Sequence, residues 1–173
     1  MPQMLIAENQ FAFFDTLRAV SDATVTFARF NVDDSVSFKT MNIAVSASAT
    51  DNQTVSFSVG LYSLNGSTLS LTNSISRTIQ ITTTRGYFLS LTGTSATQNI
   101  TPGTWWFGFL IRTGASLSLR GASTVDPANA FPGSFIGGRM TVSTAALPGS
   151  YATSDLDVTG ADAMFIPNII LSS

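Results

Sequence analysis

The stretch that decides the fold reads Val55-Ser56-Phe57-Ser58-Val59-Gly60-Leu61. Apolar residues alternate with small or polar ones, which is the period-two pattern of a β-strand with one buried face. Asn65-Gly66 follows shortly afterwards, and the alternating Thr68-Leu69-Ser70-Leu71 lies beyond it. Asn-Gly favours a two-residue type I′ turn, because both central residues of that turn need a positive φ. The stretch therefore predicts two antiparallel strands joined by a tight hairpin.

The same alternation recurs along the chain. Trp105, Phe107, Phe109 and Ile111 fall on one face of a predicted strand over residues 105–112. Residues 41–48 show the same pattern, and together with residues 55–61 and 105–112 they are the three clearest strands. We expect about eleven strands in all, the others at residues 24–32, 35–40, 67–71, 76–82, 87–91, 116–120, 136–143 and 163–170.

Turn residues such as Pro102-Gly103 and Pro148-Gly149 separate these runs. Helical patterning is scarce, and we interpret its one occurrence, residues 8–20, as a strand or an irregular arm. Many short strands with regular turns are typical of an all-β sandwich or barrel. A chain of this length fits one domain, so we expect a single domain over residues 1–173, in which residues 1–14 form either a strand or an N-terminal arm.

The composition excludes several kinds of chemistry. The 173 residues include no His and no Cys, and about a quarter are Ser or Thr. Imidazole and thiolate are the usual near-neutral proton carriers, soft-metal ligands and activated nucleophiles. Ser-His-Asp and Cys-His catalysis, zinc sites built from these groups and thiol redox switching are therefore excluded. Charged residues make up only 10 %, so we expect a hydroxyl-rich surface that copies of the chain or another protein partly cover.

Charge and hydropathy also bear on the partners. The net charge is −2 and the basic residues are scattered, so we expect no nucleic-acid binding. Residues 1–10 carry no basic segment and only a short apolar one, so we expect no secretory signal. No apolar run of 18 residues exists, so we expect no membrane-spanning helix. These features predict a soluble protein synthesised in the cytoplasm.

Three segments taken in order carry a resemblance to a known group of proteins. They are residues 60–71 (Gly-Leu-Tyr-Ser-Leu-Asn-Gly-Ser-Thr-Leu-Ser-Leu), residues 87–91 (Tyr-Phe-Leu-Ser-Leu) and residues 100–108 (Ile-Thr-Pro-Gly-Thr-Trp-Trp-Phe-Gly). This part of the chain, residues 40–120, resembles the jelly-roll-like modules of tailed-bacteriophage structural proteins. The resemblance implies an antiparallel jelly-roll-like β-sandwich with very little helix. It also implies a homotrimer that sits on the capsid as a decoration protein or on a tail appendage as a receptor-binding tip. It carries over no site residues.

Acidic residues are the only side chains that could ligate a hard metal ion. Asp33, Asp34, Asp155, Asp157 and Asp162 could supply oxygens to Ca²⁺, which binds six to eight of them. Their spacing does not match an EF-hand loop, and Asp155 and Asp157 would face the same side of a strand. We interpret them as solvated or interface carboxylates, and we expect no metal and no cofactor.

An enzyme is also not expected. A glycosidase needs two carboxyl groups that face each other across the sugar. Glu8 is the only Glu, and no local pattern marks an acid–base pair, although Trp105 or Trp106 could stack on a sugar.

Trp105 and Trp106 are adjacent, so in a strand their side chains point to opposite faces. One can lie in the core, and the other needs a cover. In one interpretation Trp106, together with Leu110, marks a subunit interface or a ligand platform, since aromatic residues are enriched at both. In the other, the strand is buried on both faces within one subunit.

Both ends of the chain are apolar and must dock somewhere. We interpret residues 163–171 as a strand of the sandwich. For the first residues, an arm that orders on a neighbouring subunit or on the capsid is the alternative to a strand. Its interface side chains would be Leu5, Ile6, Phe11, Phe13 and Phe14.

These observations lead to two hypotheses about function. The first is a virion structural protein, a capsid decoration or cement protein, whose partners are two further copies of itself and the major capsid protein. The alternative is a tail module that recognises host-surface glycan, with residues 94–104 and 126–138 as the candidate binding loops. The first of these loops contains no aromatic residue and the second contains only Phe131 and Phe135, which favours the first hypothesis.

Overall fold

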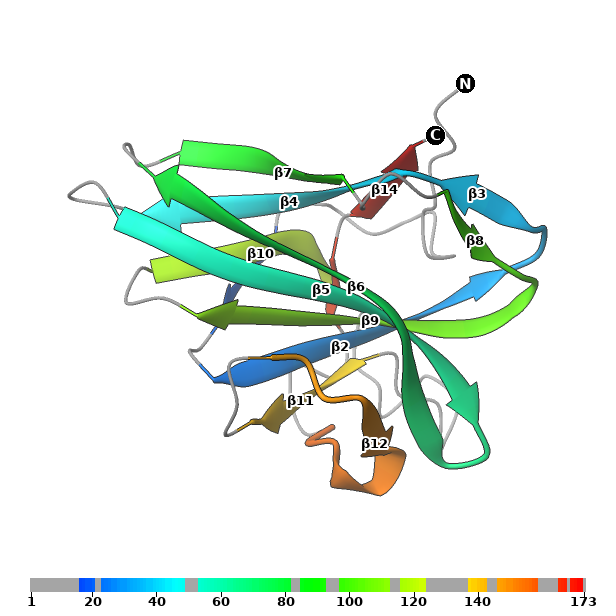
Figure 1. The fold of residues 1–173 in the computed structure, drawn as a ribbon. Helices are drawn as coiled ribbons and strands as arrows, with labels where there is room; N and C mark the ends of the chain where they lie inside the picture. Colours follow the sequence, from blue (N-terminus) through cyan, green and yellow to red (C-terminus); the bar gives the residue numbers. More distant parts are fainter. Residues whose placement is uncertain are drawn as a thin grey trace.

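Two antiparallel sheets of six strands each dominate the computed structural model (Figure 1). Apart from the short 3₁₀ turn η1 (Thr153–Asp155), the regular structure of the described residues consists of β-strands. The structure describes residues 16–20, 23–48, 53–81, 85–92, 97–112, 116–123, 137–142, 146–158, 165–167 and 169–172.

One sheet, called sheet A, contains β1 (Thr16–Val20), β10 (Ser116–Ser123), β4 (Thr40–Ser48), β7 (Arg85–Thr92), β13 (Phe165–Pro167) and β14 (Ile169–Ser172). The other, called sheet B, has the order β11 (Gly137–Thr141), β2 (Thr24–Val32), β9 (Gly103–Arg112), β5 (Gln53–Asn65), β6 (Thr68–Ile81) and β12 (Ser150–Ala152). A separate pair joins β3 (Val36–Phe38) to β8 (Gln98–Ile100).

The order of the main strands is that of a jelly roll. Four strands of sheet A pair in the order β1-β10-β4-β7, and four strands of sheet B pair in the order β2-β9-β5-β6. Successive members of this set alternate between the sheets, except that the β5–β6 hairpin stays within sheet B. This double-sheet arrangement confirms the predicted all-β, antiparallel, jelly-roll-like sandwich.

The structure corrects several predicted strand boundaries. The strand expected at residues 24–32 is β2, and its two ends were predicted correctly. The two strands expected at residues 67–71 and 76–82 are instead one continuous strand, β6. The region expected to be one strand at residues 163–170 contains β13 and β14. The short strands β8 and β12 were not expected, because three residues are too few to show a period.

The hairpin between β5 and β6 is present, but its turn differs from the predicted one. Asn65 pairs with Thr68, so the two loop residues are Gly66 and Ser67 rather than Asn65 and Gly66. Gly66 has φ +61, whereas neither Asn65 nor Ser67 has a positive φ. A glycine with positive φ at the first loop position indicates a type II′ turn, which also matches the twist of the strands.

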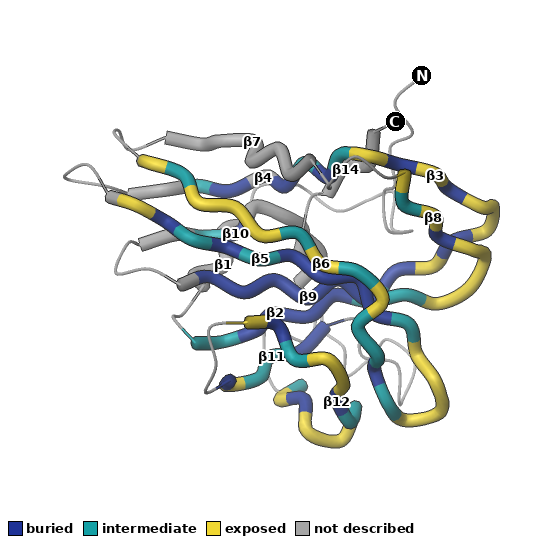
Figure 2. The backbone as a smooth tube through the Cα atoms, viewed as in Figure 1, coloured by how far each residue is buried: buried dark blue, intermediate teal, exposed yellow. Residues whose placement is uncertain are grey.

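The space between the two sheets holds the inner core. Each strand contributes alternate residues to it, as the period-two pattern predicts. Figure 2 shows the resulting burial along β2, β5 and β9. The buried members are Phe30, Val32, Val36, Phe38, Met41, Ile43, Val45, Val55, Phe57, Val59, Leu61, Ile100, Phe107, Phe109, Ile111 and Leu119.

A β-bulge lets β6 serve two cores. Leu61 pairs with Asn73 but the next residue of β5 pairs with Leu71, so Thr72 is an extra residue in β6. The extra residue reverses the alternation. On one side of the bulge Ile75 packs against the inner core, and on the other side Leu71 packs against a second core on the outer face of sheet B.

The second core is closed by residues 137–142 and 146–158, together called the cover. Six of its ten buried members lie on β2, β5, β6 and β9 of sheet B, and the other four belong to the cover. Its buried members are Val25, Phe27, Tyr62, Leu69, Trp106, Leu110, Val142, Leu147, Tyr151 and Leu156.

Two facing glycines form the floor of the second core. Gly60 pairs directly with Gly108, and the ring of Tyr62 lies where side chains at either position would project. A Cβ at Gly108 would lie 2.7 Å from Cε2 of Tyr62 and 3.1 Å from Cε1 of Phe27. The pair therefore leaves room for the rings that fill this core.

We predict that Gly108→Ala lowers the free energy of unfolding by about 1–3 kcal/mol, because the packed Tyr62 ring must shift. Urea unfolding followed by circular dichroism measures the change. Gly149→Ala is the matched control, since a Cβ there meets nothing within 4 Å, and we expect it to change stability by less than about 0.5 kcal/mol. Equal effects of the two substitutions would contradict the packing explanation.

Candidate interaction surface

Trp106 and Leu110 lie inside the chain. Trp106 is 2 % exposed and Leu110 0 % exposed, and both belong to the second core beneath the cover. A side chain enclosed by its own chain offers no surface to another subunit. Trp106 and Leu110 therefore do not lie at a subunit interface, contrary to the first interpretation of the sequence. The second interpretation, a strand buried on both faces within one subunit, fits β9.

We predict that Trp106→Ala destabilises the fold by about 3–5 kcal/mol, because it leaves a large cavity in a closed core. Thermal and urea unfolding of the purified variant measure the loss. Trp105→Ala is a useful comparison, since Trp105 is only half-buried at the edge of the inner core and should cost less. A fully stable Trp106→Ala variant would contradict the core assignment.

The remaining predicted interface residues, Leu5, Ile6, Phe11, Phe13 and Phe14, lie outside the described residues.

The described carboxylates do not form a cluster that could bind a metal ion. Asp33, Asp34, Asp155 and Asp157 are all exposed, and the described residues contain no group of three acidic, His or Cys side chains that could hold a metal ion. The main chain of Asp157 instead pairs with that of Arg139 in both directions, at 2.9 and 2.8 Å. This bridge joins the last part of the cover to β11, its first strand. Asp162, the fifth candidate, is not among the described residues.

Tyr62 connects sheet B to the cover. Its hydroxyl donates a hydrogen bond to the carbonyl of Pro148 at 3.0 Å. Phe27 packs edge-on against both Tyr62 and Tyr151, with ring centroids 5.3 and 5.8 Å away. Burial, and secondarily the neighbouring Tyr151, raises the pKa of Tyr62 far above its ordinary value. The pKa of Tyr151 is also raised, first by burial and then by the negative charge of Asp155.

These shifts predict alkaline destabilisation. The folded-state pKa exceeds the unfolded value of about 10, so the folded state keeps its phenolic protons where the unfolded chain loses them. The contribution of these two tyrosines to the free energy of unfolding is fully present below about pH 10 and is lost as the pH rises further. We expect urea unfolding to show a lower free energy at about pH 11 than at about pH 8. Tyr62→Phe should reduce this pH-dependent fall while costing about 1 kcal/mol at neutral pH through the lost hydrogen bond. An unchanged pH profile in that variant would contradict the prediction.

Beyond the cover, the outer face of β5 and β6 carries paired hydroxyl groups. The hydroxyls of Ser56 and Thr78 lie 2.9 Å apart, and those of Ser58 and Ser76 lie 2.7 Å apart. These side-chain hydrogen bonds link directly opposed residues of the two strands. They form a polar, uncharged patch, called the hydroxyl patch.

The hydroxyl patch continues to a sheet edge. β5 pairs along one edge of β6, whereas β12 covers the other edge only at residues 68–70. The N–H of Leu71 then donates to the carbonyl of Gly149 at 2.9 Å. Within the described part of the chain no strand pairs with this edge at residues 72–81, called the β6 edge. Figure 2 shows much of this stretch as exposed, and its exposed side chains are Thr72, Ser74, Ser76, Arg77, Thr78 and Gln80.

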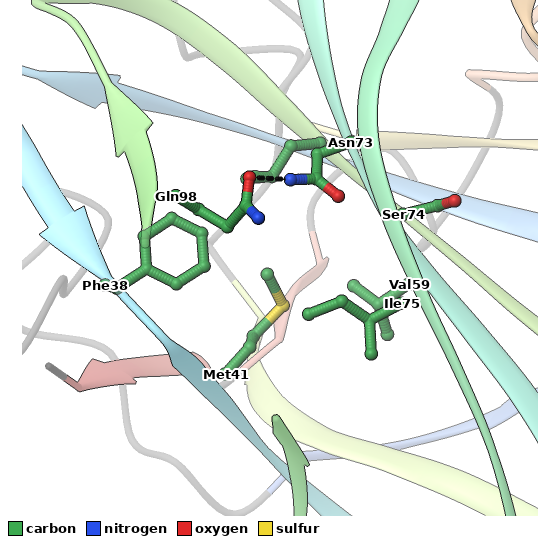
Figure 3. A pocket seen from close by; sticks show the side chains of 8 residues that line it. Phe38, Met41, Val59, Asn73, Ser74, Ile75 and Gln98 are labelled. Atoms are coloured by element: carbon green, nitrogen blue, oxygen red, sulfur yellow. Dashed lines mark hydrogen bonds between the residues drawn. The ribbon is translucent and has the colours of Figure 1, made fainter. Parts of the chain in front are cut away.

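A small cavity lies between β6 and the β3–β8 pair. Phe38, Met41 and Ile75 converge on it, and Asn73 donates a hydrogen bond to the side-chain carbonyl of Gln98 at its margin (Figure 3). Its volume of about 10 Å³ corresponds to roughly one water molecule. The cavity is therefore too small for an organic substrate, and the surface of β5 and β6 is the stronger candidate for interactions.

Comparison of the chain with protein-family models, with curated proteins and with solved structures finds no match. Among the described residues there is no helix with the length and apolarity needed to cross a bilayer.

Proposed function

We propose that the chain is a virion structural protein, a decoration or cement protein that binds between capsomers of a phage head as a homotrimer. The observation that carries the proposal is the hydroxyl patch. This surface presents hydroxyl groups on the face of sheet B, and Arg77 is the only charged residue within residues 72–81 of β6. Such a surface suits contact with protein more than chemistry on a small molecule.

The jelly-roll architecture supports the proposal as well. Double-sheet jelly rolls are recurrent in viral capsid and lectin domains. The three segments that resemble phage modules, residues 60–71, 87–91 and 100–108, include the end of β5, the start of β6, most of β7 and the first half of β9, so they lie in both sheets of the sandwich.

The mechanism follows from additive contact energy. A protein that binds the assembled shell but not its separated subunits stabilises the shell by mass action. Attachment as a trimer multiplies weak contacts, because the second and third contacts form at high effective concentration. Hydrogen bonds from the hydroxyl groups of the patch supply these contacts without salt bridges.

Recognition of host glycan by a tail appendage is the alternative. Sugar binding of that kind uses exposed aromatic rings, and Trp105 is the one half-buried ring among the aromatic side chains whose burial is described. Its indole N–H donates to the carbonyl of Thr101 at 2.9 Å, and its ring packs at the inner core. This arrangement leaves less of the ring for stacking and favours the decoration role.

We predict that immunogold electron microscopy of phage particles carrying the protein labels the whole head. Labelling confined to the tail tip would favour glycan recognition instead, and unlabelled particles would exclude a virion role. Sedimentation equilibrium of the purified protein tests the oligomer, with an expected mass, in the limit of low protein concentration, of three times the chain mass of 18.3 kDa.

A further inference from the structure

The β6 edge has the properties of a strand-pairing site. An edge strand presents unpaired N–H and C=O groups, and proteins usually protect it with charges, proline, bulges or a short length. Residues 72–81 contain no proline and a single charge, Arg77, and the bulge lies at the end of the stretch next to Leu71. No described strand pairs with the rest of the edge, and neither its length nor its sequence protects it from an added strand.

The sequence of this edge is compatible with a second copy of itself. In an antiparallel pair about a twofold axis, opposed residues lie on the same face of the sheet, so the outward hydroxyl residues meet one another. An axis at Ser76 places Ser74 opposite Thr78 and Thr72 opposite Gln80. These contacts repeat across the axis the Ser–Ser and Ser–Thr pairs that already join β5 to β6.

Charge selects this register over its closest competitor. An axis at Arg77 would use an equally long stretch, residues 73–81, but it would set the two Arg77 side chains directly opposite each other, which is unfavourable. The axis at Ser76 instead places Arg77 opposite Ile75 of the second copy. Axes further along the strand shorten the paired stretch.

We propose that the β6 edge pairs antiparallel with the same edge of a second copy about a twofold axis at Ser76. This pairing joins the two copies of sheet B into one continuous sheet. It goes beyond the proposed capsid role and does not depend on it, because monomers or trimers can both pair through this edge.

The absence of Cys in the chain makes single-cysteine variants specific probes. Directly opposed Cβ atoms lie about 4.5–5.5 Å apart, close enough for a disulfide after a small adjustment. We expect Ser76→Cys to form covalent dimers under mild oxidation at least about tenfold faster than Ser37→Cys, since pairing raises the effective thiol concentration. Ser37 is a matched control because it is an exposed strand serine on β3.

Mixed variants test the register. Ser74→Cys mixed with Thr78→Cys should give cross-linked heterodimers. Ser74→Cys alone should give no cross-linked dimer, because its two thiols would lie about 13 Å apart along the strands.

Ser76→Lys should abolish the concentration-dependent association seen by sedimentation velocity while the circular dichroism spectrum is retained. Dimer formation by Ser76→Cys no faster than by Ser37→Cys, or no heterodimer from the mixture, would overturn the proposal. Loss of head labelling alone would refute the capsid role and leave this result unaffected.

Discussion

The packing of Tyr62 over the facing glycines Gly60 and Gly108 is the contact on which the outer half of sheet B depends. The two glycines remove the side chains that would otherwise occupy this place. The ring then reaches Phe27 on one side and the Pro148 carbonyl on the other. One side chain thus joins the strands of the sheet to the cover, and the hydrogen bond satisfies its buried hydroxyl, which would be costly to leave unpaired.

This contact also divides the outer face of sheet B into two regions with different roles. Under the cover the face is apolar and closed, and β9 is buried on both sides. Beyond the cover the same strands present serine and threonine hydroxyls. A single sheet thereby provides both internal stability and an external surface, and the boundary lies where the bulge at Thr72 reverses the alternation of β6.

The sequence predicts the strands better than their surroundings. Alternation identifies β2 and β9 because it reports directly which residues share a face. It cannot report what lies beyond that face, so the burial of Trp106 by the remote cover was not foreseeable from Trp105-Trp106 alone. The union of two predicted strands into β6 was missed for a related reason. An extra residue in a strand breaks the period without ending the hydrogen bonding.

The layered arrangement has a consequence for how the protein loses its structure. The inner core and the second core share sheet B but are closed by different parts of the chain, sheet A and the cover. Proteins open in cooperative units whose free energies differ. We therefore expect release of the cover to open the second core and expose Trp106 to solvent before the inner core opens. Amide exchange should then fall into two units, with the indole of Trp106 reporting on the outer one.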